Sequence, residues 1–307
     1  MRVFVTGATG HIGSAVVREL LQARHDVIGL ARSDASAAAL TEAGALVQSG
    51  TLDDLDALRQ GAEQADGVIH LAYMHDAPPG VDAAAADRRA IQAFGDVLVG
   101  SGKPFVGTSG SLVLPPGRLG TEQDPGDPGA AAAVRVAAEN EALALAQRGI
   151  RSCVVRLAPA VHSTLDSHGF VPSLIRIARE KGVAAYVADG ANRWPTVHTL
   201  DAARLFRLAL ERAVDGAPPG SRWHGAGDSA VPFRQITEVI GRHLDLPVTS
   251  IAPEQAGAHF GWLSFATTAD NPTSSDITLT RLGWRPEHPG LIADLDAGHY
   301  FAPGAEA

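Results

Sequence analysis

Three glycines near the N-terminus have the spacing of a phosphate-binding turn. Gly7, Gly10 and Gly13 follow a short apolar run at residues 3–5 and precede a segment whose apolar residues recur at helical spacing. Glycines in such a turn permit a tight bend, a close approach to a pyrophosphate, and close packing of helix on strand, while the helix N-terminus favours an anion. We therefore predict a dinucleotide-binding turn, in preference to a tight turn without a ligand. Its contact residues would be Gly7, Thr9, Gly10, His11, Ile12 and Gly13.

The residues after the second apolar run indicate which dinucleotide is bound. NAD sites usually place Asp or Glu there, whereas this chain has Arg32 followed by Ser33. Arg32 can bond a 2′-phosphate with two N–H groups, and Ser33 can add a hydrogen bond. Asp34 is better placed to cap the next helix. We predict NADP (as NADPH) as the cofactor, with NAD less favoured; the alternative is that Arg32 is only a solvated surface residue.

These residues lie within a regular alternation of predicted strands and helices. Strands are expected at residues 3–5, 27–30, 45–47, 67–71, 104–107 and 153–157. Helices are expected from residue 12, at 35–43, near 55–58, at 83–99 and at 130–147. Such alternation predicts parallel pairing with right-handed crossovers, and uninterrupted apolar strands predict a sheet covered on both faces. The expected fold is therefore an α/β, doubly wound parallel sheet of the Rossmann-like kind.

The second half of the chain is less regular. Helices are expected at residues 169–181, 200–214 and 233–244, and short strands at 184–187 and 222–224. We predict a dinucleotide-binding domain at residues 1–160. Residues 161–307 would form mainly a substrate-binding region, with segments near 194–214 returning to the core sheet.

Composition excludes several classes of function. The 307 residues are 45% apolar and carry a net charge of −9, which disfavours a nucleic-acid partner. No apolar run is long enough to span a membrane, and the N-terminus lacks the pattern of a secretory signal, so we expect a cytoplasmic protein. The single cysteine, Cys153, rules out an internal disulfide, and no His, Asp or Glu set has the spacing of metal ligands.

Taken together, these motifs resemble the short-chain dehydrogenase/reductase superfamily, in its extended and atypical, epimerase/dehydratase-like branches. The resemblance rests on the glycine spacing and on segments 50–53, 68–72, 156–161 and 195–203. It implies that Leu52 packs on the adenine, that Leu71 and Ala72 lie at the cofactor ribose, and that Pro159 and Val161 lie beside the nicotinamide. Thr51 stands where the usual aspartate of the adenine segment is expected.

The resemblance also shows a departure at the expected catalytic pair. Family members use a Tyr, which protonates the substrate oxygen, and a Lys four residues later, which binds the ribose. Counted back from Glu139, Arg135 takes the place of the Lys and Ala131 that of the Tyr. The resemblance implies that Arg135 binds the ribose, and the usual proton donor is absent.

Four other side chains are candidates for the missing chemistry. Relatives place a serine after the fifth strand to bond the substrate carbonyl, and both Ser109 and Ser111 fit that position. His162 follows the sixth strand, at the sheet edge where ligands gather, and a histidine transfers protons near neutral pH. Tyr73 follows the fourth strand and could also reach the site. Each of them could instead have only a structural role.

We expect an NADP-dependent oxidoreductase that transfers a hydride to a small carbonyl- or imine-like substrate. One alternative is a cofactor-binding sensor or scaffold without turnover, because the phosphate turn is intact while the usual acid is missing. Another is a sugar-nucleotide epimerase/dehydratase-like enzyme, which would need the same Tyr–Lys pair. By analogy with relatives, the helices at 83–99 and 130–147 could form a homodimer face.

Overall fold

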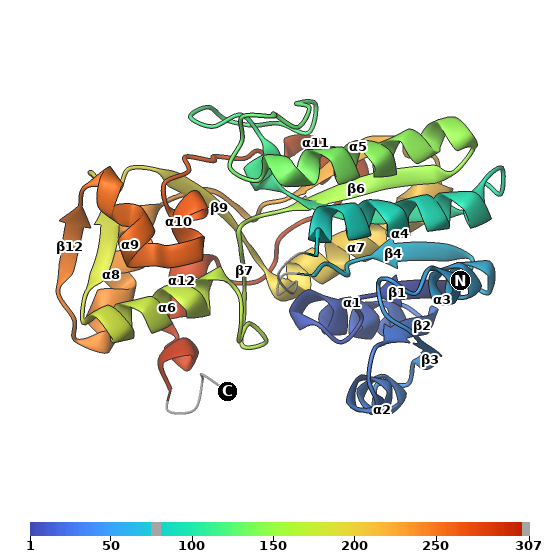
Figure 1. Cartoon of the computed structure of the whole chain (residues 1–307), viewed down its shortest axis with the longest axis horizontal. Coiled ribbons are helices and arrows are strands. Elements are labelled where there is room, and N and C mark those ends of the chain that lie inside the picture. Colours follow the sequence, from blue (N-terminus) through green and yellow to red (C-terminus); the bar gives the residue numbers. More distant parts are fainter. Residues whose placement is uncertain (75–80, 303–307) are drawn as a thin grey trace.

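A seven-stranded parallel sheet forms the centre of the protein. The computed structural model describes residues 1–74 and 81–302 (Figure 1). The strands lie in the order β10-β6-β5-β4-β1-β2-β3, and each neighbouring pair is parallel. Their bounds are β1 Arg2–Thr6, β2 Asp26–Ala31, β3 Leu46–Ser49, β4 Gly67–His70, β5 Pro104–Gly110, β6 Arg151–Leu157 and β10 Ser221–Gly225. This confirms the predicted doubly wound, Rossmann-like fold. The strand order reverses between β1 and β4, where ligands of such sheets bind.

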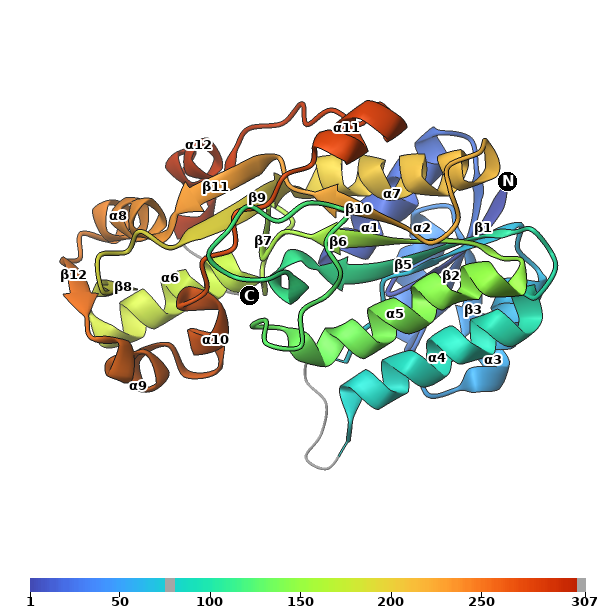
Figure 2. The same cartoon turned by 90° about the horizontal axis from the view of Figure 1, so that it is seen from above.

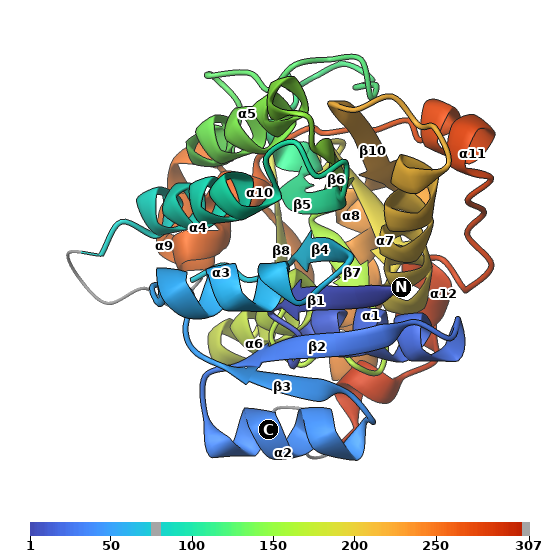
Figure 3. The same cartoon turned by 90° about the vertical axis from the view of Figure 1, so that its right-hand side faces the viewer.

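Helices cover both faces of this sheet (Figure 3). Val3 and Val5 of β1 pack into the cluster that contains α1 (His11–Gln22) and α7 (Thr199–Val214). Phe4 packs into the opposite cluster, with α3 (Leu55–Glu63), α4 (Ala83–Leu98) and α5 (Val136–Ala144). Because alternate residues of β1 are buried on opposite faces, the strand has to be apolar throughout. Helix α2 (Asp34–Glu42) lies beside β3 at the edge of the sheet.

The beginning of α5 differs from the sequence expectation. The helix predicted at residues 130–147 begins at Val136, after a 3-10 turn at Ala133–Arg135, and ends in a second 3-10 segment at Leu145–Arg148. Residues 127–132 form a turn, in which Ala132 N–H donates to the carbonyl of Leu112. This tertiary hydrogen bond outweighs the helix propensity of the alanines, so Ala131 lies exposed in a turn.

A smaller correction concerns the start of α2. Ser33, and not Asp34, caps this helix: its hydroxyl accepts the Ser36 N–H, and its own N–H donates to the Ser36 hydroxyl. Asp34 occupies the first turn of the helix.

The second half forms a separate layer beside the carboxyl ends of the sheet strands (Figure 2). One sheet has the order β11-β9-β7, from β7 Ala160–His162, β9 Arg193–His198 and β11 Asp228–Pro232; another pairs β8 Ala184–Val187 with β12 Val248–Ile251. The helices are α6 Phe170–Lys181, α8 Phe233–Leu244, α9 Ala256–Phe260, α10 Ser264–Thr267, α11 Asp276–Leu282 and α12 Leu291–Asp296.

Residues 193–214 contribute to two different sheets. Helix α7 packs against the main sheet. However, β9 joins the three-stranded sheet, because it pairs with β7 and β11. The strand that returns to the main sheet is β10, alongside β6.

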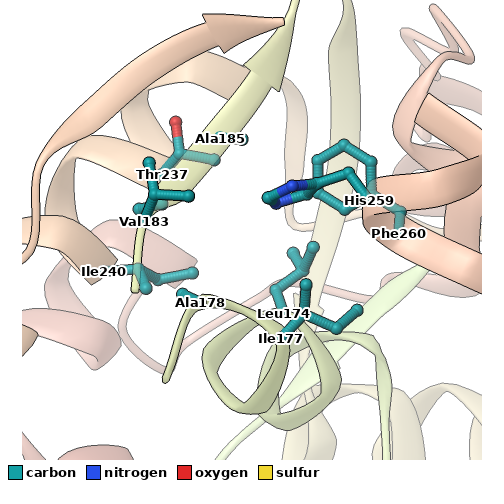
Figure 4. A pocket seen from close by; sticks show the side chains of 10 residues that line it. Leu174, Ile177, Ala178, Val183, Ala185, Thr237, Ile240, His259 and Phe260 are labelled. Atoms are coloured by element: carbon teal, nitrogen blue, oxygen red, sulfur yellow. The ribbon is translucent and has the colours of Figure 1, made fainter. Parts of the chain in front are cut away.

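Helices α6, α8 and α9 and strand β8 line a cavity of about 10 Å³ (Figure 4). Its lining is mostly aliphatic, with Thr237 and the imidazole of His259 as polar groups. This volume suits a single water molecule and is too small for a substrate. None of the described helices is long and apolar enough to cross a membrane.

Candidate functional site

The phosphate turn between β1 and α1 has no room for side chains at two of its glycines. A Cβ on Gly13 would lie 1.9 Å from the carbonyl oxygen of Gly7. Gly7 has a φ of +66°, and a Cβ there would lie 2.8 Å from the amide nitrogen of Ala72. The turn is therefore pressed against both the helix start and the end of β4, and Leu71 and Ala72 lie directly beside it.

The N-terminal amides of α1 are available to an anion. Gly10 caps the helix without a side-chain hydrogen bond, and the first turn has no acidic residue. Thr9 and Gly10 are exposed. Ile12 packs on the core. The dipole and free N–H groups at this end fit the pyrophosphate of a dinucleotide.

The side chain of His11 points away from a phosphate site. Its Nε2 is 2.7 Å from the hydroxyl of Thr199 on α7, and its Nδ1 is 3.6 Å from the carboxylate of Asp166. Burial, together with the charge of neighbouring histidines such as His162, lowers the pKa of His11 to about 4. His11 is therefore neutral at pH 7, and it would offer an anion only its backbone N–H.

The two residues that follow β2, Arg32 and Ser33, differ in whether their side chains are already engaged by other residues. Arg32 is exposed and makes no hydrogen bond or ion pair with any residue of the described ranges 1–74 and 81–302. The hydroxyl of Ser33 is occupied in capping α2. Leu52 is 8% exposed and packs with Leu30 under the sheet, so at most its edge could meet an adenine.

The other predicted cofactor contacts lie at strand ends. Ala72 N–H donates to the hydroxyl of Thr6 at 3.2 Å, which ties the end of β4 to β1. Pro159 is half-buried between β6 and β7. Val161 lies on β7, opposite Val197 of β9.

A buried hydrogen-bonded chain runs from the phosphate turn to Arg135. Because Ala72 N–H donates to Thr6, the Thr6 hydroxyl can donate its own proton to Nδ1 of His70, 2.7 Å away. Nε2–H of His70 then donates to the carboxylate of Asp87 at 3.0 Å. The second oxygen of Asp87 lies 3.4 Å from Nη1 of Arg135.

The far end of this chain brings Arg135 and Tyr73 together. The guanidinium carbon of Arg135 lies 3.8 Å from the centre of the Tyr73 ring, in cation–π contact. Nη2 of Arg135 also donates to the carbonyl of Thr108 at 3.0 Å. The phenol of Tyr73 and the guanidinium of Arg135 thus lie together at the ends of β4 and β5, the edge of the sheet at which such folds bind a nicotinamide and its substrate.

The two candidate serines differ: Ser111 has a hydrogen-bond partner, whereas the buried hydroxyl of Ser109 has none among the described residues. The hydroxyl of Ser111 donates to the side-chain oxygen of Asn271 at 2.7 Å. Ser109 is buried beside the carboxylate of Glu139. Burial alone would raise the pKa of Glu139, but hydrogen bonds and charge from Arg156 hold it below its ordinary value.

His162 is completely buried and turned toward α12. Its Nδ1 lies 2.8 Å from the carboxylate of Asp294, and its ring packs edge-on against His198. His168, by contrast, is exposed and pairs with the hydroxyl of Ser167. The geometry therefore gives His162 a packing and hydrogen-bonding role.

Comparison with known proteins places the chain among dinucleotide-dependent enzymes. The model of the NAD dependent epimerase/dehydratase family matches residues 3–222. The chain belongs to this family. An uncharacterized protein of Schizosaccharomyces pombe is 46% identical, over 98% of this chain and 100% of that protein. A 3-diazoavenalumate denitrifying reductase of a Streptomyces species is 28% identical, over 94% of this chain and 97% of that one.

Solved structures agree on the fold of this epimerase/dehydratase family member. The structure of MoeE5 in complex with UDP-glucose and NAD superposes with a TM-score of 0.73 and 21% sequence identity, over 97% of each chain.

Two buried carboxylates of this family member escaped the sequence analysis. Asp87 lies on the buried face of α4, four residues before Ile91 and seven before Phe94. An acidic residue in such an apolar stripe is the signal by which the sequence could have revealed it. Asp166 accepts the Gly169 N–H at 2.8 Å and the Tyr300 hydroxyl at 3.2 Å. Burial raises the pKa of Asp166 to about 7.

His198, Asp201 and His288 gather closely enough to suggest a metal site within the described part of the chain. However, Asp201 already accepts the backbone N–H groups of Glu287 and His288 and a bond from the His288 ring. The two imidazoles stack in parallel at 4.5 Å, so their in-plane lone pairs do not converge on one point. This cluster fits the anchoring of α7 better than metal ligation.

Proposed function

We propose that the protein is an NADP-dependent reductase that transfers a hydride to a small carbonyl- or imine-like carbon. Membership of a nicotinamide-dependent family supports the use of such a cofactor. The observation that carries the NADP preference is Arg32, exposed and unpaired within the described residues beyond β2, with no carboxylate at the end of that strand. That a 28% identical Streptomyces relative is a reductase supports the reaction class.

Each part of the site has a role in this proposal. When bound, a nicotinamide cofactor would be the source of the hydride. The α1 amides bind the pyrophosphate, and Arg32 bonds the 2′-phosphate with two N–H groups. Arg135, fixed by Asp87 and by the carbonyl of Thr108, offers its remaining N–H groups to the ribose. Because a guanidinium does not release a proton, the hydroxyl of Tyr73 donates the proton to the substrate oxygen.

Calorimetric titration with NADPH and NADH tests the cofactor assignment. We expect the wild type to bind NADPH at least tenfold more tightly, because charge-assisted hydrogen bonds contribute about 1.5–3 kcal/mol. Arg32→Glu should reverse the preference. Arg88→Glu, at an exposed arginine of α4, is the matched control and should leave it unchanged. Equal or tighter binding of NADH by the wild type would refute the assignment.

A second candidate function is a cofactor-binding sensor without turnover. It is favoured by the exposed turn at Ala131 and by the hydrogen bond that engages Ser111 with Asn271. NADPH oxidation across a panel of ketones, aldehydes, quinones and imines separates the two. Turnover that is lost in Tyr73→Phe supports the reductase, whereas tight NADPH binding without oxidation of any panel member supports the sensor.

A further inference from the structure

Three aromatic side chains form a partly exposed group in the second half of the chain. Phe170 begins α6, and its ring lies 5.6 Å from that of Trp262 and 6.1 Å from that of Phe265, both edge-to-face. Trp262 is 57% exposed and Phe265 is 38% exposed. Aromatic groups that remain open to solvent in this way are suited to bind an apolar partner. We call these three residues the aromatic group.

Phe170 connects the aromatic group to a core cluster that reaches the end of β5. Phe170 packs on the same core cluster as Leu112 and Ala132, which flank the end of β5 and the turn that leads to Arg135. Asn271, which follows α10, is bonded to both the hydroxyl and the carbonyl of Ser111. Figures 1 and 2 both place α10 on the side of the second half that faces the beginning of α5.

The charges around the aromatic group do not suit a nucleoside diphosphate. Such a ligand needs cations that are free to bond its phosphates. Arg193, next to Trp194 that packs on Phe170, is held by Asp270 through hydrogen bonds of 2.9 and 2.7 Å. Arg118, in the loop after β5, is likewise paired with Asp124. Both of these arginines therefore already have a carboxylate partner.

We propose that the aromatic group binds the ring of an uncharged aromatic carbonyl substrate, and that the protein does not act on nucleoside-diphosphate sugars. This inference rests on the proposed reductase function and defines its substrate class. A flat ring can stack against Trp262 and meet Phe265 edge-on, which are the favoured geometries for aromatic pairs. Its carbonyl would extend toward Tyr73 and Arg135.

Trp262 supplies a built-in reporter of binding. The other tryptophans, Trp194, Trp223 and Trp284, are at most 1% exposed, so Trp262 is the one that a ligand can contact directly, and fluorescence changes that are absent from Trp262→Leu are assigned to it. The probes are acetophenone, its non-aromatic analogue cyclohexyl methyl ketone, and UDP-glucose. We expect saturable quenching by acetophenone, at least tenfold weaker binding of cyclohexyl methyl ketone, and no saturable response to UDP-glucose.

Variants show whether the aromatic group is the binding surface. Trp262→Leu and Phe265→Leu should each weaken acetophenone binding about tenfold, measured by ligand-observed NMR, because each removes one aromatic contact. Val99→Ala, at a 52% exposed residue at the end of α4, is the control and should leave binding unchanged. NADPH affinity should stay constant in all three variants.

Distinct results would overturn this inference. UDP-glucose binding more tightly than acetophenone, or acetophenone binding unaffected by Trp262→Leu, contradicts it. A wild-type dimer in sedimentation that dissociates on Trp262→Leu would show that a second copy covers the aromatic group. In each of these cases intact NADPH binding leaves the proposed function standing, whereas loss of NADPH binding in the wild type would refute that function independently.

Discussion

Replacing Asp87 by Asn should lower the free energy of unfolding by about 3 kcal/mol. The Asp87 side chain is 3% exposed, accepts from His70 at 3.0 Å and lies 3.4 Å from Arg135. Removing one member of a buried ion pair costs about 3–5 kcal/mol, and the 17% exposure of Arg135 places this pair at the lower end. Urea unfolding followed by tryptophan fluorescence measures the change.

The matched control lies on the same helix. Asp96 pairs with Arg148 at 3.0 Å, but the two side chains are 58% and 39% exposed. Asp96→Asn should therefore cost less than about 1 kcal/mol. NADPH affinity should also fall in Asp87→Asn alone, because Arg135 loses its anchor. Equal costs for the two variants would refute the idea that the chain from Thr6 to Arg135 is a strongly coupled buried network.

Three further predictions follow from the geometry and the burial of single groups. Gly13→Ala should abolish NADPH binding in calorimetry, since its Cβ would lie 1.9 Å from a carbonyl oxygen, whereas Gly257→Ala, in open space, should bind normally; normal binding by both would contradict the packed turn. Burial raises the pKa of Asp166 to about 7, so the folded state keeps a proton that the unfolded chain releases above about pH 4, and stability falls as pH rises toward 7. Urea unfolding should then show Asp166→Asn gaining up to about 4 kcal/mol relative to the wild type between pH 4 and pH 8, and a difference that does not change with pH would disprove this. Burial also raises the pKa of the Cys153 thiol to about 12, so a thiol reagent should label it only in urea; labelling of the native protein would show that the strand opens.

The fold could be predicted because its signals are local. The glycine turn and the apolar strands depend on residues next to one another in sequence, and the structure has them where the pattern placed them. The start of α5 could not be predicted in this way. Ala130 to Ala133 favour a helix by propensity, but the bond from Ala132 to Leu112, across twenty residues, holds a turn there.

The site was less predictable because its groups act through distant partners. His162 was expected at the edge of the sheet, yet Asp294, 132 residues later, determines where its ring points. The partnership of Tyr73 with Arg135 depends on how β4 and α5 meet, and no spacing in the sequence encodes it. Asp87 and Asp166 gain their importance from burial, which becomes visible only when the layers are assembled.

The late beginning of α5 has a consequence for protein engineering. A tyrosine grafted at position 131 would not rebuild the Tyr–Lys arrangement, even alongside Arg135→Lys, because residues four apart stack over one another only on a continuous α-helix. In this structure a tyrosine at position 131 would lie in an exposed turn. Placing a tyrosine one helical turn before residue 135 would therefore require a helical backbone through residues 131–135 as well as the substitution itself.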